Sequence, residues 1–67
     1  MRLSNSELAG LIDEHINGRN AQRNRAVLKR RLIDGVTLER LAEEFELSVT
    51  QIKAIIYKGE YTLSNYV

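Results

Sequence analysis

Apolar and polar residues recur at helical spacing along most of the chain, and they separate most clearly within residues 36–58. In a projection at about 100° per residue, one side of the first part of this stretch is apolar. This side holds Leu38, Leu41, Ala42 and Phe45. In the second part, the apolar arc consists of Val49, Ile52, Ile55 and Ile56. The opposite arc has no aliphatic side chain longer than alanine and consists of Thr50, Gln51, Lys53, Ala54, Tyr57 and Lys58. The pattern predicts two amphipathic helices joined by a tight turn.

Two further helices are predicted before this stretch. Ser4 and Glu7 have the spacing of a capping box, in which each side chain bonds the other residue's backbone amide. A helix is therefore expected over 5–16. A second helix is expected over 21–34, closed by Gly35 in a left-handed conformation.

Capping residues also mark where the two later helices begin. Thr37 precedes the third helix, and Ser48, with Gln51 at capping-box spacing, precedes the fourth. Gly59 is expected to end or fray the fourth helix. The pattern leaves open whether residues 60–67 pack back on the core or continue a helix.

The 67 residues are expected to form a single helical domain over 1–67, near the lower size limit at which an apolar core stabilises a fold alone. The chain has no proline, and the 43% of residues that are hydrophobic fall at helical rather than strand spacing. We predict an all-α fold: a small bundle of about four helices that contains a helix-turn-helix over 37–58.

Several kinds of chemistry are not expected. The absence of cysteine excludes disulfides and thiolate metal sites. No apolar run approaches the roughly 20 residues of a membrane span and no signal peptide is visible, so a soluble, cytoplasmic protein is expected. His15 stands alone in the apolar stripe of the helix over 5–16 and is interpreted as a packed residue, not a metal ligand. Without a nucleophile–base pair, metal cluster or phosphate loop, neither enzymatic activity nor a cofactor is expected.

The charges are distributed unevenly, although the net charge is only +1 and therefore low for a DNA-binding domain. Residues 19–34 carry six Lys or Arg against one Asp, whereas residues 35–48 carry one Arg against four Glu. Residues 49–67 carry two Lys against one Glu. A positive segment and a positive helix thus flank an acidic one, which is consistent with one phosphate-facing surface.

Three features coincide within residues 25–58: an Arg-rich helix ending in I-D-G, the helix T-L-E-R-L-A-E-E-F, and the start L-S-V-T-Q-I-K of the last helix. Together they resemble the fourth region of bacterial sigma factors, especially the short stand-alone proteins of this type from phages and prophages of Gram-positive bacteria. The resemblance implies a helix-turn-helix that binds an upstream promoter element, with RNA polymerase as a candidate second partner. It covers about half of the chain, and no counterpart of the other sigma segments is visible, so a complete sigma factor is not expected.

One position departs from the usual helix-turn-helix pattern. Such families often have glycine in the turn, where this chain has Glu46. A positive φ angle is uncommon for residues other than glycine. We therefore expect this turn to be strained or differently shaped.

The last helix is the expected recognition helix, over 49–58, with its first residues facing base edges in the major groove. Gln51 offers the paired donor and acceptor that suit adenine, and Lys53 can donate to guanine or to phosphate. The Thr50 methyl group or Ala54 can contact a thymine methyl. The candidate phosphate contacts are Ser48, Tyr57 and Lys58, together with Arg19, Arg23 and Arg30 of the basic segment. The competing interpretation is a solvated helix face and arginines that only maintain solubility.

The remaining charged and apolar positions have structural interpretations as well. Arg25 lies beside the apolar arc of its helix and is expected to pair with Glu39 or Glu43 rather than to bind DNA. The acidic set Glu39, Glu43 and Glu44 is either a solvated face or a docking surface for a basic partner such as RNA polymerase. The stripe of the helix over 5–16 is either intramolecular core or the seam of a homodimer.

The leading hypothesis is a sequence-specific transcription regulator that binds double-stranded DNA, resembles sigma region 4 and comes from a phage or prophage. One alternative is a phage packaging or recombination accessory protein that uses the same fold on another DNA site. A different alternative is a helical protein-interaction module that binds RNA polymerase without touching DNA, favoured by the low net charge and the acidic third helix.

Overall fold

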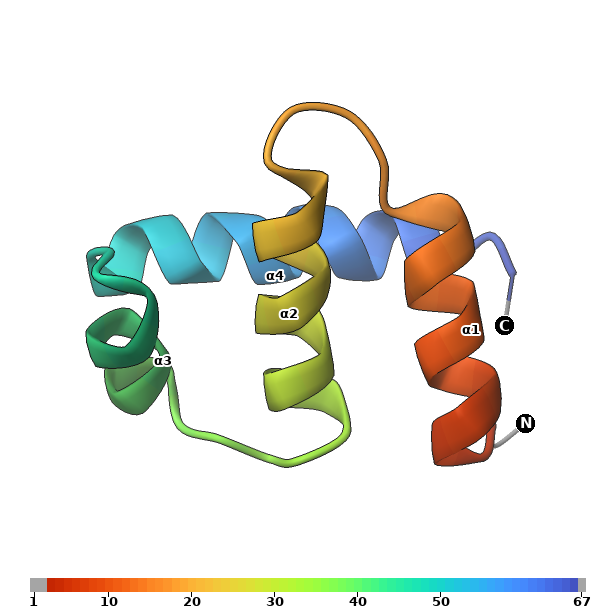
Figure 1. The fold of residues 1–67 in the computed structure, drawn as a ribbon, viewed down its shortest axis with the longest axis horizontal. Helices are drawn as coiled ribbons and strands as arrows, with labels where there is room; N and C mark the ends of the chain where they lie inside the picture. Colours follow the sequence, from red (N-terminus) through yellow and green to blue (C-terminus); the bar gives the residue numbers. More distant parts are fainter. Residues whose placement is uncertain (1–2, 67) are drawn as a thin grey trace.

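The computed structural model describes residues 3–66, which contain four α-helices and no strand (Figure 1). The helices are α1 (Asn5–His15), α2 (Ala21–Leu32), α3 (Leu38–Phe45) and α4 (Val49–Leu63). In Figure 1, α1 and α2 lie side by side and antiparallel, α4 crosses both of them, and α3 lies at the end of α4 that is farther from α1. The predicted all-α bundle of about four helices is confirmed.

The core lies where α2 meets the other three helices, and every one of those three packs against it. Val27 and Leu28 in the middle of α2 have no exposed surface. The other core residues are Ile12, Ile16, Leu41, Ile52, Ile56 and Leu63. Full burial of one such side chain stabilises the fold by about 1.5–3 kcal/mol. Because α2 is central, its two ends emerge on different sides of the core and meet different neighbours.

The amino-terminal helices agree with the expected boundaries to within two residues. Ser4 and Glu7 form the predicted capping box, and α1 ends at His15 rather than at residue 16. Gly35 has the expected left-handed conformation with φ of +70°, but α2 ends at Leu32 instead of residue 34. The loop between the two helices contains two residues with positive φ, Gly18 at 93° and Asn20 at 62°.

The expectation that Gly59 would end or fray the fourth helix is wrong, because α4 continues to Leu63. Gly59 is instead the place where α4 passes closest to α2. A Cβ atom at this position would lie only 2.5 Å from Cδ1 of Leu28. Glycine is needed there because of this close approach, which a single helix cannot reveal.

The tail after Gly59 both continues the helix and packs on the core. Leu63 is 4% exposed and belongs to the core cluster. Tyr66 stacks on His15, with ring centroids 3.6 Å apart and an interplanar angle of 10°. His15 is half-buried, as its packed interpretation predicts.

Candidate nucleic-acid interface

The turn between α3 and α4 has Glu46 in the left-handed conformation, with φ 55° and ψ 46°. Its amide donates to the carbonyls of Ala42 and Glu43, and the amide of Leu47 donates to Ala42 at 2.9 Å. These bonds satisfy the carbonyls left free at the end of α3. Glu46 therefore takes the conformation that glycine adopts more easily, at a cost of about 1 kcal/mol.

The start of α4 is held by the predicted capping box. The amide of Gln51 donates to Oγ of Ser48 at 3.1 Å, and the amide of Ser48 donates to Oε1 of Gln51 at 2.9 Å. Oε1 of Gln51 is thus already an acceptor within the protein. A bidentate contact to adenine would have to share this oxygen, through its second lone pair, with the Ser48 amide.

The rest of the predicted DNA-binding arc forms one exposed face of α4. Its members are Thr50, Gln51, Lys53, Ala54, Tyr57 and Lys58, all of them exposed, as is Ser48. Beneath them Ile52 is fully buried and Ile56 is 6% exposed. The register of the helix is therefore the predicted one. Residues 49–59 contain no acidic side chain, so no carboxylate of this stretch opposes an anionic partner.

Arg30 does not lie with the other candidate phosphate contacts. Its Nε donates to Glu44 at 3.1 Å, its Nη2 also donates to Glu44, and its Nη1 donates to Asp34 at 3.2 Å. The Glu44 hydrogen bond, with help from Asp34, raises the pKa of Arg30 above its ordinary value. The same bond lowers the pKa of Glu44. The guanidinium of Arg30 thus joins α2 to α3 and is engaged by carboxylates within the protein.

The neighbouring basic residues at this end of α2 are also engaged within the protein. Nζ of Lys29 lies 2.7 Å from a carboxylate oxygen of Asp13 on α1. Nη1 of Arg31 donates to the carbonyl of Val36 at 2.9 Å. The carboxyl-terminal end of α2 thus uses its cations to hold the helices and the loop around it.

The expected pairing of Arg25 with Glu39 or Glu43 is wrong. Nε of Arg25 donates to the carbonyl of Ile16 at 2.7 Å, and its Nη2 donates to Oδ1 of Asn17 at 2.9 Å. Arg25 therefore fixes the loop between α1 and α2 instead of contacting α3. The helical projection placed Arg25 correctly beside the apolar arc of α2, but it could not show which segment of the chain packs against that side.

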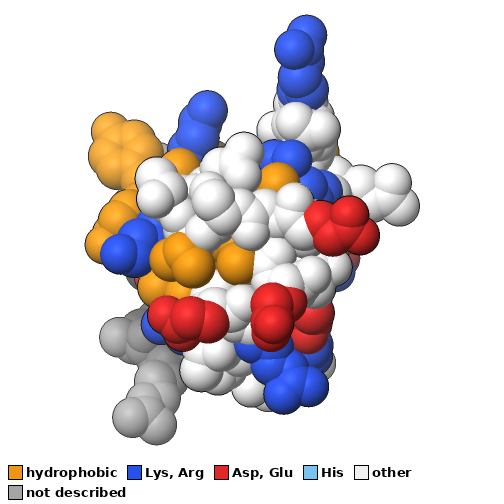
Figure 2. Space-filling view, turned by 90° about the vertical axis from the view of Figure 1, so that its left-hand side faces the viewer, with side chains coloured by type: hydrophobic (Ala, Val, Ile, Leu, Met, Phe, Trp, Pro, Cys, Tyr) orange, Lys and Arg blue, Asp and Glu red, His pale blue; other side chains and the backbone are white. Residues whose placement is uncertain are grey.

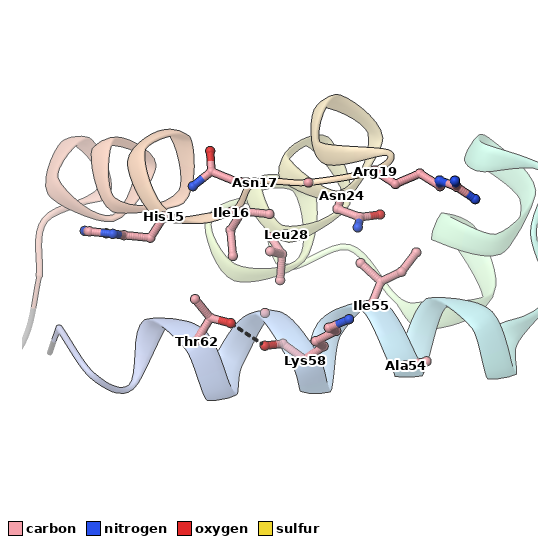
Figure 3. A pocket seen from close by; sticks show the side chains of 12 residues that line it. His15, Ile16, Asn17, Arg19, Asn24, Leu28, Ala54, Ile55, Lys58 and Thr62 are labelled. Atoms are coloured by element: carbon pink, nitrogen blue, oxygen red, sulfur yellow. Dashed lines mark hydrogen bonds between the residues drawn. The ribbon is translucent and has the colours of Figure 1, made fainter.

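A groove of about 390 Å³ separates the α1–α2 loop and the start of α2 from α4 (Figure 3). Its lining consists of His15, Ile16, Asn17, Gly18, Arg19, Asn24, Leu28, Ala54, Ile55, Lys58, Gly59 and Thr62. Arg19 and Asn24 lie on one side, and Lys58 and Thr62 lie on the other. None of the lining residues is acidic. Two of the predicted phosphate contacts, Arg19 and Lys58, are thereby brought to one site.

Arg23, the remaining predicted phosphate contact, bonds its neighbour Asn24. Its Nε and Nη2 both donate to Oδ1 of Asn24, at 3.2 and 3.1 Å. The oxygen of the Asn24 amide is thereby engaged, and the nitrogen is oriented toward α4 in Figure 3. Sequence reasoning missed Asn24, since nothing in its local pattern distinguishes it from an ordinary solvated position.

The acidic residues of α3 fall into two groups. All three glutamates Glu39, Glu43 and Glu44 are exposed, but Glu44 also bonds Arg30 and lies 4.0 Å from Arg40. Figure 2, which views the α3 end of the molecule, shows acidic side chains across the middle and lower part of this face, with Lys and Arg side chains around them. This end is mixed in charge, so the groove and the exposed face of α4 are the parts best suited to an anion.

Within residues 3–66, no group of three or more His, Asp or Glu side chains is arranged to hold a metal ion. Across the same residues, no helix has both the length and the apolar character needed to cross a membrane. Comparison of the chain with models of protein families, with curated proteins and with solved structures finds no match.

Proposed function

We propose that this protein is a transcription regulator that binds double-stranded DNA by placing α4 in the major groove. The observation that carries the proposal is the exposed face of α4, which is polar, has no acidic residue over residues 49–59 and lies directly after a capped tight turn. An α-helix with its side chains is about 10–12 Å wide, which matches the major groove. The sigma-like resemblance of residues 25–58 points in the same direction.

Thr50, Lys53 and Ala54 are the proposed base-contacting residues. Lys53 donates to guanine acceptors, and the methyl groups of Thr50 and Ala54 contact a thymine methyl. Gln51 contributes mainly by holding the helix start, because its Oε1 is bonded to the Ser48 amide. Ser48, whose hydroxyl can still donate, contacts a phosphate.

The proposal is tested by selecting bound sequences from a random duplex pool and measuring affinity against salt. Lys53→Gln should weaken binding to the selected site about tenfold. Lys29→Gln is the matched control: it also removes one positive charge, but from the Asp13 pair on another face. Absence of duplex binding at about 50 mM salt would exclude the proposal, since phosphate contacts are strongest at low salt.

Gln51 provides a second test, because its cap and its base contact can be separated. Gln51→Glu retains the capping box, for which glutamate is equally suited, but introduces a negative charge at the proposed interface. The variant should fold normally and bind duplex much more weakly. Equal binding by wild type and Gln51→Glu would place the start of α4 outside the interface.

A protein-interaction module is the second candidate, and it rests on two exposed tyrosines. Tyr57 is 69% exposed and Tyr61 is 79% exposed, one helical turn apart on α4. Tyrosine is enriched in the centres of protein–protein interfaces. In this case α4 would bind a protein such as RNA polymerase. Tyr61→Ser would then weaken capture of purified polymerase, and duplex DNA would not compete.

A further inference from the structure

We propose that the groove between the α1–α2 loop, α2 and α4 holds one sugar–phosphate strand of the bound duplex. The side chains that donate hydrogen bonds to the phosphates of this strand are Arg19, Asn24 and Lys58. This inference rests on the proposed DNA-binding function, and it adds a backbone-binding site beside the face of α4 that contacts bases.

The lining of the groove matches the chemistry of a nucleic-acid backbone. A backbone alternates anionic phosphates with largely apolar deoxyribose rings. The groove has Arg19 and Lys58 on opposite sides, and the exposed Ala54 and the half-buried Ile55 add apolar side chains to its lining. No lining residue is acidic, so the cations meet no competing carboxylate within the groove.

Asn24 completes the set of donors because its amide is held in one orientation. Both hydrogen bonds from Arg23 end on Oδ1. Nδ2 is left as the free end of the amide, and it lies on the α4 side in Figure 3. Arg23 is therefore a positioning residue, which keeps a hydrogen-bond donor and not an acceptor directed at the groove.

The position of the groove favours a duplex over a small anion. Ala54 and Lys58 belong both to the exposed face of α4 and to the groove wall. A helix in the major groove has a phosphate strand on each side. A strand in this groove would therefore be continuous with the bases contacted by Thr50 and Lys53. The lining has no Tyr, Phe or Trp, and the ring of its His15 is already stacked on Tyr66, so the groove is poorly suited to the base of a free nucleotide.

The decisive variant is Asn24→Asp. The carboxylate has the same shape and still accepts both hydrogen bonds from Arg23, so the fold should be unchanged. It replaces the donor with a negative charge that repels phosphate, and duplex affinity should fall about tenfold or more at low salt. Asn5→Asp is the matched control, because Asn5 is exposed and begins α1 at the end away from the groove.

The salt dependence tests the two cations. Arg19→Gln and Lys58→Gln should each reduce the slope of log affinity against log salt by about 0.9, the value for one phosphate contact. They should weaken binding equally for selected and unselected duplexes. Lys29→Gln should change the slope much less, because Lys29 pairs with Asp13 and does not line the groove.

The positioning role of Arg23 has its own readout. In an Arg23→Gln background the Asn24 amide is no longer held, so Asn24→Ala, which removes the donor without adding a charge, should cost less affinity than it does in wild type. A purely structural Arg23 would give additive losses and a lower unfolding midpoint.

The outcomes separate this inference from the proposed function. If Lys53→Gln weakens duplex binding while Asn24→Asp behaves like Asn5→Asp, the groove assignment is overturned and DNA binding stands. If inorganic phosphate displaces the duplex at millimolar concentration from wild type but not from Lys58→Gln, the groove is a small-anion site, which also overturns the assignment. If wild type binds no duplex, both proposals fall together.

Discussion

The two ends of α2 carry similar basic side chains but use them in different ways. At the carboxyl-terminal end, Arg30 bonds Glu44 and Asp34, and Lys29 pairs with Asp13. At the amino-terminal end, Arg19 of the preceding loop lines an open groove whose lining has no carboxylate, and Arg23 bonds Asn24, which also lines it. One end faces helices that supply acidic partners, whereas the other faces a cation on α4.

This difference shows that positive charge in a sequence does not by itself measure capacity for an anionic partner. Ion pairs at the first end are exposed, and exposed pairs contribute little to stability individually. They do, however, satisfy the guanidinium and ammonium groups involved. Among residues 3–66, the cations at the groove and along α4 have no such partner, and these are the ones that the proposed DNA binding would use to release counterions.

The largest expected effect comes from the shared centre of α2. Leu28 is fully buried, so Leu28→Ala should lower the free energy of unfolding by about 2–5 kcal/mol. The contacts at both ends of the helix should then be lost together. A urea titration should show the loss of stability, and a binding assay should show the loss of duplex binding. If binding survived at full strength in the folded fraction, the groove would not depend on the packing of α2.

Gly59→Ala should destabilise the domain by about 1–3 kcal/mol, although alanine favours helix. The new methyl group would lie 2.5–3.0 Å from the side chain of Leu28, which is fully buried. In a Leu28→Ala background the same substitution should cost less or even stabilise, because it enters the cavity. Thermal unfolding of the two single variants and the double variant measures this coupling, and additive effects would contradict the close approach.

A matched pair of variants tests the contrast between the two ends directly. Arg30→Gln should lower the unfolding midpoint modestly, because it leaves Glu44 and Asp34 without their shared partner, and it should leave duplex affinity in the folded protein unchanged. Arg23→Gln should lower the duplex affinity and leave the unfolding midpoint unchanged. If both variants lost affinity equally, the division of α2 into a structural and a binding end would be wrong.

Glu46→Gly should stabilise the domain by about 0.5–1 kcal/mol, since glycine adopts φ of 55° without the left-handed penalty but loses more chain entropy. The change leaves both ends of α2 untouched. It therefore provides a more stable background in which small decreases in the free energy of unfolding, caused by variants at either end of α2, can be measured with denaturant. Destabilisation would show that the Glu46 side chain makes a favourable contribution larger than the strain.

The smallest effect is a dependence on pH confined to the structural end. The hydrogen bond from Arg30 lowers the pKa of Glu44 in the folded state below its ordinary value of 4.5. The resulting stabilisation is present above about pH 4.5 and is lost as the pH falls through the lowered folded-state pKa. The free energy of unfolding, measured between about pH 6 and pH 3, should therefore depend less on pH in Glu44→Gln than in wild type. Identical profiles for wild type and Glu44→Gln would exclude this contribution.

Much of the local structure could be predicted because its causes lie within a few residues. Ser4, Thr37 and Ser48 bond amides only three positions away, so the starts of α1, α3 and α4 are visible in the sequence. The register of α4 follows from the spacing of Ile52 and Ile56. The contacts of Arg25, Arg30 and Gly59 could not be predicted for the opposite reason, since each is made with another element.

The sequence by itself determined the four helices, the left-handed position available to Gly35, and the polar face of α4, because periodicity and caps act over one or two helical turns. Only the tertiary structure decided which cations are neutralised and which remain available. Arg30 and Glu44 are 14 residues apart in sequence, and Arg19 and Lys58 are farther apart still. Their proximity arises from the packing of α2 against α3 and α4, and no local pattern records it.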